Sequence, residues 1–181
     1  MRTTVRGSTS SSTDVDIPSV AAFIDAALQY ESSWERAEDH ELLHGGGLEY
    51  YGASVGAIRG TLRNARRRYP DLRHDDVVRL ASELWSRPVF ERRLTAVVLL
   101  QSSAQLLRHT DLTRIEGFLR TAGLPYLEDA LALDVVAPLM EQLSGQEAAR
   151  ARVVLERWAG GDSMPLQRAA VRAATGRRSS G

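Results

Sequence analysis

Apolar residues recur at helical spacing along almost the whole chain, and the alternating pattern of a half-buried strand is almost absent. Gly and Pro stand between the periodic segments, where they end one helix or begin the next. We therefore predict an all-α fold of helices joined by short turns, either a bundle or an α-solenoid of antiparallel helix pairs. The predicted helices cover residues 17–30, 34–44, 54–69, 74–85, 89–108, 112–122, 131–143 with a kink at Pro138, 146–158 and 164–174.

A chain of 181 residues is long enough for one domain with a buried core. The sequence places that domain at residues 17–174. Residues 1–16 and 175–181 are rich in Ser, Thr, Gly or Arg, and we expect both to be disordered tails. The tryptophans Trp34, Trp85 and Trp158 fall on the apolar stripes of predicted helices, and all three are predicted to lie in the core.

Composition excludes several classes of protein. The chain has no cysteine, so it has no disulfide framework, no thiol nucleophile and no cysteine-ligated metal. No apolar run approaches the roughly 20 residues of a membrane span. The first residues include Arg2 and Arg6 but no apolar stretch, so no secretory signal is expected and the predicted location is cytoplasmic.

The net charge of zero hides an uneven distribution. All 23 basic residues are Arg. Residues 14–49 hold nine acids against Arg36 alone, whereas residues 50–181 hold 20 Arg against 14 acids. Because the local field decides what a surface attracts, the second region can carry a face that binds nucleic acid.

One helix concentrates this positive charge. Arg59, Arg63, Arg66 and Arg67 fall on one face of the predicted helix 54–69, and phosphates would relieve their mutual repulsion. Arg168 and Arg172, four residues apart, form a second and smaller basic stripe. The alternative interpretation is a solvated outer face that pairs with acids of the first 49 residues.

Four segments resemble the DNA alkylation repair family of HEAT-like glycosylases. They are LEYYGASVGAIRGTLRNA from Leu48, ASELWSRPVFERRLTAVVLLQ from Ala81, LEDALALDVVAPL from Leu127 and ERWAGGDSMPLQRAAV from Glu156. The resemblance lies in the order and spacing of these segments, and it covers roughly residues 35–174.

The resemblance implies a HEAT-like α-solenoid whose basic concave surface binds double-stranded DNA with alkylated bases. It also implies hydrolysis of the N-glycosidic bond of N3- or N7-alkylated purines, by a monomer that needs no metal and no other cofactor. By the same resemblance, Asp129 is the catalytic carboxylate and Arg168 faces the DNA. Arg172, Arg59, Arg63, Arg66 and Arg67 complete the predicted DNA-binding set.

Two other functions stay open. The second hypothesis is a DNA- or protein-binding helical module that has lost catalysis. Pro125 and Pro165 stand where the family has tryptophans of the DNA groove, and the chain stops before a further helix pair, as this hypothesis expects. The third hypothesis is a zinc hydrolase. In the segment HELLH, His40 and His44 would be metal ligands, Glu41 the general base and Glu49 the nearest further acid, although Gly45 to Gly47 end the helix at once.

Overall fold

The computed structural model describes residues 15–176, and over these residues it contains helices and no strand. Residues 1–14 and 177–181, which belong to the predicted tails, lie outside the described residues. The predicted all-α fold is confirmed. The helices are α1 (Ile17–Tyr30), α2 (Trp34–His44), α3 (Val55–Arg68), α4 (His74–Trp85), α5 (Phe90–Gln101), α6 (Leu112–Arg120), α7 (Pro125–Ala130), α8 (Ala137–Gln142), α9 (Gly145–Gly160) and α10 (Met164–Gly176), with the short turns η1 (Ala104–Leu106) and η2 (His109–Asp111) and the π-helical segment η3 (Leu131–Val136).

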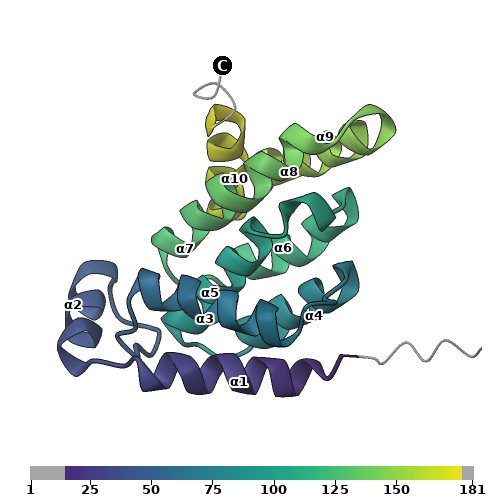
Figure 1. Cartoon of the computed structure of the whole chain (residues 1–181). Coiled ribbons are helices and arrows are strands. Elements are labelled where there is room, and N and C mark those ends of the chain that lie inside the picture. The colour runs from purple at the N-terminus through teal and green to yellow at the C-terminus, as the bar shows by residue number, and fades with distance from the viewer. Residues whose placement is uncertain (1–14, 177–181) are drawn as a thin grey trace, which may run out of the picture.

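The helices pack in successive pairs. Helix α1 packs against α3, α4 against α5, α6 against η3, and α9 against α10. Figure 1 shows these pairs following one another from the bottom of the molecule to the top. The second members form a continuous row, because α3 contacts α5, α5 contacts η3, and η3 contacts α10. This arrangement is compatible with the predicted solenoid of antiparallel helix pairs.

The core forms between the paired helices. The central helix α5 is buried on almost all sides, as its apolar sequence predicts. Trp85 and Trp158 are buried as predicted, with 5% and 1% of their surfaces exposed. Their indole N–H groups donate to Thr121 Oγ1 at 3.0 Å and Glu116 Oε2 at 2.9 Å, so neither buried ring leaves a polar atom without a partner.

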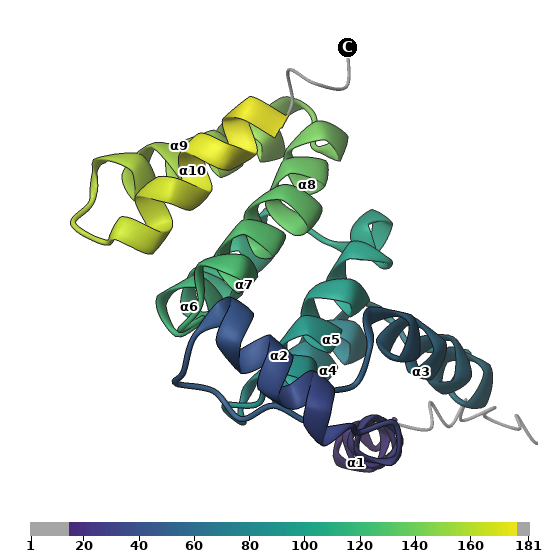
Figure 2. The same cartoon turned by 90° about the vertical axis from the view of Figure 1, so that its left-hand side faces the viewer.

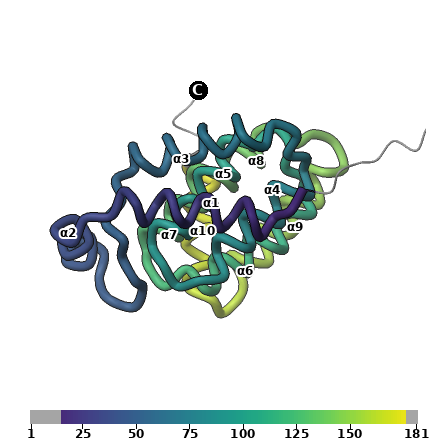
Figure 3. Tube along the Cα trace, turned by 60° about the horizontal axis from the view of Figure 1, so that its bottom comes forward, coloured from purple at the N-terminus to yellow at the C-terminus, as the bar shows by residue number. Residues whose placement is uncertain are grey.

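The prediction for Trp34 is wrong, because 75% of this residue is exposed. Trp34 is the first residue of α2, and no residue of α2 is buried. Figures 1 and 3 show α2 at the edge of the molecule, apart from the stacked pairs. The apolar spacing predicts a core stripe on this helix, but α2 contacts the body through Arg36 and its two histidines instead.

The loop after α2 fixes how this helix joins the body. Arg36 Nε donates to the carbonyl of Gly52 at 2.7 Å, and the amide of Ser33 donates to the carbonyl of Tyr51 at 3.1 Å. Gly52 has a φ of 76°, and a Cβ atom there would lie 2.0 Å from the carbonyl oxygen of Ser33. Only glycine therefore allows the loop to approach α2 this closely.

The predicted helix 89–108 is shorter in the structure, since α5 ends at Gln101. The hydroxyl of Ser102 donates to the carbonyls of Val98 at 2.7 Å and Leu99 at 3.1 Å. A side chain that takes up the last carbonyls of a helix favours its end. The turns η1 and η2 then carry the chain to α6.

The predicted helix 131–143 instead begins at Pro125 and continues without a break through α7, η3 and α8 to Gln142. Pro138 has no amide hydrogen to donate to the carbonyl of Asp134, four residues earlier. The π-helical turn η3 precedes the helix that contains this proline. Such turns are rare and occur frequently at functional sites, so the exposed side chains of η3 are candidates for a functional role.

Candidate nucleic-acid interface

The arginine stripe of α3 follows from the way this helix packs. Ser54 caps its N-terminus by accepting a hydrogen bond from the amide of Ala57 at 3.1 Å. Ile58, Leu62 and Ala65 are buried on one face. Helical periodicity therefore turns the arginines outward. All four predicted members of the stripe are exposed: Arg59, Arg63, Arg66 and Arg67.

Three of these arginines border a groove between α3 and α5. Arg59, Arg63 and Arg66 line one wall, and Val98 and Gln101 belong to the other. The volume of the groove is about 290 Å³. Arg67, the fourth predicted member, does not line it.

The arginines of the groove are held differently. Arg66 Nη2 donates to Ser102 O and Ser102 Oγ at 2.9 Å and to Ser103 Oγ at 2.8 Å. Arg59 and Arg63 form no hydrogen bond or ion pair with any residue that the structure describes. Arg66 therefore joins α3 to the end of α5, while the other two guanidinium groups keep all their donors for a ligand.

The predicted arginines of α10 lie against consecutive acids of α7. Arg168 Nη2 lies 2.5 Å from Glu128 Oε2, and Arg172 Nε lies 2.5 Å from Asp129 Oδ1. The arginine side chains are 45% and 47% exposed. Each arginine is thus neutralised by a protein carboxylate and still has donors that face solvent.

A further carboxylate on the same continuous helix lacks such a partner among the described residues. Asp134 of η3 is half-buried, and its side chain forms no hydrogen bond or ion pair with residues 15–176. Burial raises the pKa of Asp134, and the positive charge of Arg59 opposes this shift. Arg59 of the α3 stripe is therefore the positive charge that acts on Asp134 through space.

Asp134 is not among the predicted site residues, although the sequence carries a signal for it. It is the one acid in the apolar segment Leu131–Val136. An acid in such a segment loses hydration on folding, and an acid kept there without a partner is a candidate functional group. The family resemblance indicates Asp129 for the catalytic role, five residues earlier.

Apolar side chains are exposed beside these carboxylates. Tyr126 and Leu133 are 42% and 40% exposed and lie seven residues apart along α7 and η3, on the face that also carries Asp129. The ring of Tyr126 packs against His44 and Phe90, at centroid distances of 4.6 and 5.8 Å. The Tyr126 ring is thus held by two aromatic neighbours, and a part of the residue stays exposed to solvent.

The row of helices brings most of the predicted residues to one layer. Figure 2 shows α3, α5, α7 with α8, and α10 in this order from right to left. The α3 stripe, the carboxylates Asp129 and Asp134 and the α10 arginines all belong to helices of this row.

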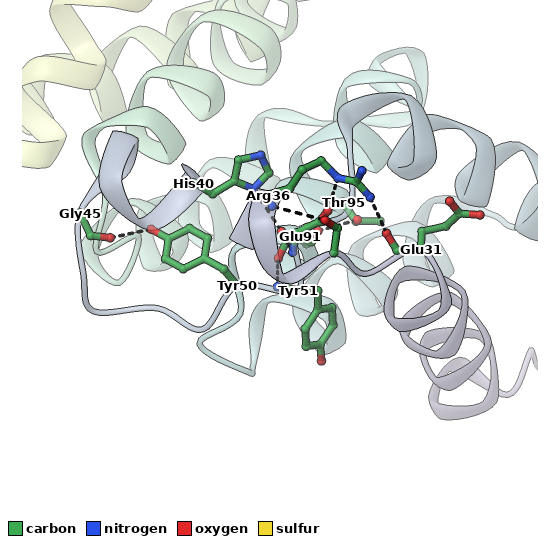
Figure 4. Close-up of polar contacts among 10 residues, drawn as sticks. Glu31, Arg36, His40, Gly45, Tyr50, Tyr51, Glu91 and Thr95 are labelled. Atoms are coloured by element: carbon green, nitrogen blue, oxygen red, sulfur yellow. Dashed lines mark hydrogen bonds and ion pairs between the residues drawn. The ribbon is translucent and has the colours of Figure 1, made fainter. Parts of the chain in front are cut away.

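The HELLH segment has a different arrangement from a metal site. His40 Nδ1 lies 3.4 Å from Glu91 Oε1, and this buried carboxylate also accepts the amides of Tyr51 at 2.9 Å and Gly52 at 2.8 Å (Figure 4). His44 instead stacks on the ring of Phe90, at 5.0 Å. Burial, and then the neighbouring His40, lower the pKa of His44.

Within residues 15–176, no three His, Asp or Glu side chains gather as a metal site requires. The two histidines of α2 instead attach this helix to the body, through the carboxylate of Glu91 and the ring of Phe90. The described part of the chain therefore offers no ligand set for the zinc hydrolase hypothesis.

The fold and the site together define an all-α protein in which one row of helices carries an arginine-lined groove and two arginine–carboxylate pairs. Residues 24–178 match the family described as DNA alkylation repair enzyme, and the chain belongs to this family. The family predicted from the resemblance is thereby confirmed. Membership implies a role in DNA alkylation repair with DNA as the substrate. No curated protein matches the chain, and no helix within residues 15–176 has the length and apolar character needed to cross a membrane.

Proposed function

We propose that this protein binds duplex DNA through the α3 and α10 arginines and removes N3- or N7-alkylated purines by hydrolysing the N-glycosidic bond. The proposal rests on the family and on one observation. Arg59, Arg63 and Asp134, which form no hydrogen bond or ion pair with residues 15–176, belong to the same row of helices, and the charge of Arg59 acts on Asp134. This arrangement supports a model in which the arginines contact phosphates and the carboxylate lies near the sugar of the lesion.

The reaction needs few catalytic groups because alkylation of the base itself weakens the N-glycosidic bond. Alkylation at N3 or N7 gives the purine a positive charge and makes it a good leaving group. As the bond between base and sugar breaks, positive charge develops on the sugar, as in glycoside hydrolysis. A fixed carboxylate stabilises this charge more than it stabilises the uncharged ground-state sugar, and it can orient the attacking water.

Two carboxylates are candidates for this role. Asp129 is the residue that the family resemblance indicates, and in the structure it is bound to Arg172. Asp134 forms no ion pair with residues 15–176, and the charge of Arg59 acts on it only through space. A carboxylate that is not held in an ion pair stabilises a developing positive charge more strongly, so we favour Asp134 and retain Asp129 as the alternative.

Release of 7-methylguanine and 3-methyladenine from methylated duplex DNA tests the proposal. We expect the wild-type protein to release at least one of these bases, and we expect Asp134→Asn to abolish the release while duplex binding persists. If Asp129→Asn abolishes it instead, the catalytic role belongs to Asp129. If the wild-type protein releases neither base, the glycosylase proposal is wrong.

The second candidate function is a DNA-binding helical module without catalysis. The ion pair between Asp129 and Arg172 favours it, because it engages the carboxylate that the resemblance selects. This function predicts duplex binding that weakens steeply with added salt, without release of any base.

A further inference from the structure

Glu128 of α7 is an acid that neither proposed function uses. Only 7% of this residue is exposed. Its carboxylate has one side-chain partner among the described residues, which is Nη2 of Arg168 at 2.5 Å. Since a buried carboxylate is costly without a cation, this contact fixes the position of the Arg168 guanidinium.

Arg168 keeps donors for a second contact. Its guanidinium forms no other hydrogen bond with residues 15–176, and 45% of the side chain is exposed. A guanidinium has five N–H donors in a rigid plane. When one nitrogen is anchored on a buried acid, the direction of the remaining donors is set as well.

A second arginine–carboxylate pair lies one turn further along α10. Arg172 lies four residues after Arg168 on α10, and its partner Asp129 directly follows Glu128 on α7. The two acids differ in burial, since the side chain of Glu128 is 8% exposed and that of Asp129 is 33% exposed. The more buried acid is the stronger anchor because water competes least for its carboxylate.

We propose that Glu128 is a positioning residue, which orients the Arg168 guanidinium so that its exposed N–H groups donate to a phosphodiester oxygen of the DNA. This inference rests on the proposed DNA binding by α10. It runs against simple electrostatics, in which a negative charge behind a DNA-binding face weakens binding. The two views therefore predict opposite signs for the effect of removing the charge of Glu128.

The experiment measures the affinity of Glu128→Gln for a short undamaged duplex at low salt, by fluorescence anisotropy. We expect the dissociation constant to rise about five- to tenfold, the loss of roughly one charge-assisted contact. The matched control is Glu141→Gln, which removes an exposed acid of α8. We expect the control to bind as tightly as the wild type or more tightly.

A double-mutant cycle tests whether Glu128 acts through Arg168. In the Arg168→Ala background, Glu128→Gln is expected to cause no further loss of affinity. Arg168→Lys, an exposed substitution that keeps the charge, is expected to bind several-fold more weakly, because an ammonium does not present the fork of a guanidinium. This variant keeps the test available if Glu128→Gln does not fold.

The outcomes separate this inference from the proposed function. If the wild-type protein does not bind duplex DNA, the proposed function itself fails. If the wild type binds, but Glu128→Gln binds equally well or more tightly, Glu128 has no positioning role. Wild-type affinity in Arg168→Lys would also overturn the inference, since the orientation of the guanidinium would then not matter.

Discussion

The two basic regions of this protein use the same residue type in different ways. On α3, Arg59 and Arg63 form no hydrogen bond or ion pair with the described residues, and Arg66 is held by neutral hydroxyl and carbonyl groups. On α10, Arg168 and Arg172 are each bound to a carboxylate of α7. The α3 region thus has a net positive charge, whereas the α10 region is locally neutral.

From this difference we expect the α3 region to attract the DNA and the α10 region to orient it. Unneutralised arginines create the field that draws in a polyanion and release counterions when it binds. Arginines fixed by acids add little to that field but present their donors in defined directions. We therefore expect α3 to dominate the affinity for DNA and α10 to dominate its placement.

The largest expected effect is on binding by α3. Reversing two charges with Arg59→Glu and Arg63→Glu is expected to weaken binding of any duplex about 100-fold at low salt, because two phosphate contacts become repulsive. Anisotropy with two unrelated duplex sequences measures this. A double variant that binds as the wild type does would show that the α3 groove does not contact DNA.

The second expected effect is on protein stability, because substitutions in the two basic regions should change the free energy of unfolding by different amounts. Arg168→Ala leaves the buried carboxylate of Glu128 without its cation, so we expect it to lower the free energy of unfolding by about 2 kcal/mol. Arg63→Ala removes an exposed side chain, and we expect a change within about 0.5 kcal/mol. Denaturant unfolding measures both variants, and equal losses would remove the contrast between the regions.

Tyr126 tests whether the α7 side of the interface contacts the lesion. Tyr126→Ala removes the exposed ring beside the carboxylates, and we expect base release to fall about tenfold, within the range of one stacking contact. The affinity for undamaged duplex is expected to stay nearly unchanged. Tyr30→Ala, which removes an exposed ring of α1, is the control, and an equal loss there would refute a specific role.

The contacts of His74 with Asp75 and Asp111 lie outside both basic regions. Removing them is expected to have the smallest effect, and this effect is on protein stability. Burial alone would lower the pKa of His74, but hydrogen bonds to Asp111 and Asp75 raise it overall, against the smaller effect of Arg108. Its contribution to stability is therefore complete below the unfolded pKa of about 6.5 and is lost as the pH rises through the higher folded pKa.

We expect the difference in unfolding free energy between wild type and His74→Gln to be about 1 kcal/mol or less near pH 6, and to shrink as the pH rises above neutrality. Denaturant unfolding at several pH values measures this difference. A difference that grows with pH would contradict the assigned direction of the shift. Because His74 lies on α4, DNA binding is not expected to change.

The helices could be predicted because local signals set most of their ends. The predicted bounds of 17–30, 34–44 and 74–85 agree with the structure. Gly45, with a φ of 95°, ends α2 where the glycine run predicts. The end of α5 could not be predicted in this way because it depends on the hydroxyl of Ser102, which the apolar pattern around it does not reveal.

The site was harder to predict than the fold, because its contacts join distant segments. The stripe on α3 follows from spacing within one helix, and the structure exposes it as expected. The pairing of Arg168 with Glu128 depends on how α10 packs against α7, which no local pattern encodes. Trp34 shows the same limit, since helical spacing does not tell which side of a helix meets the body.

The absence of buried residues in α2 has a consequence for motion. A segment held by a few polar contacts and stacked rings opens at a small free-energy cost compared with the rest of a domain. The amide hydrogens of α2 would thus exchange with solvent well before those of α5. Since His44 packs on Tyr126, each opening of α2 also removes one aromatic neighbour of that ring while Phe90 stays in place, so motion of this peripheral helix changes the surface around Tyr126.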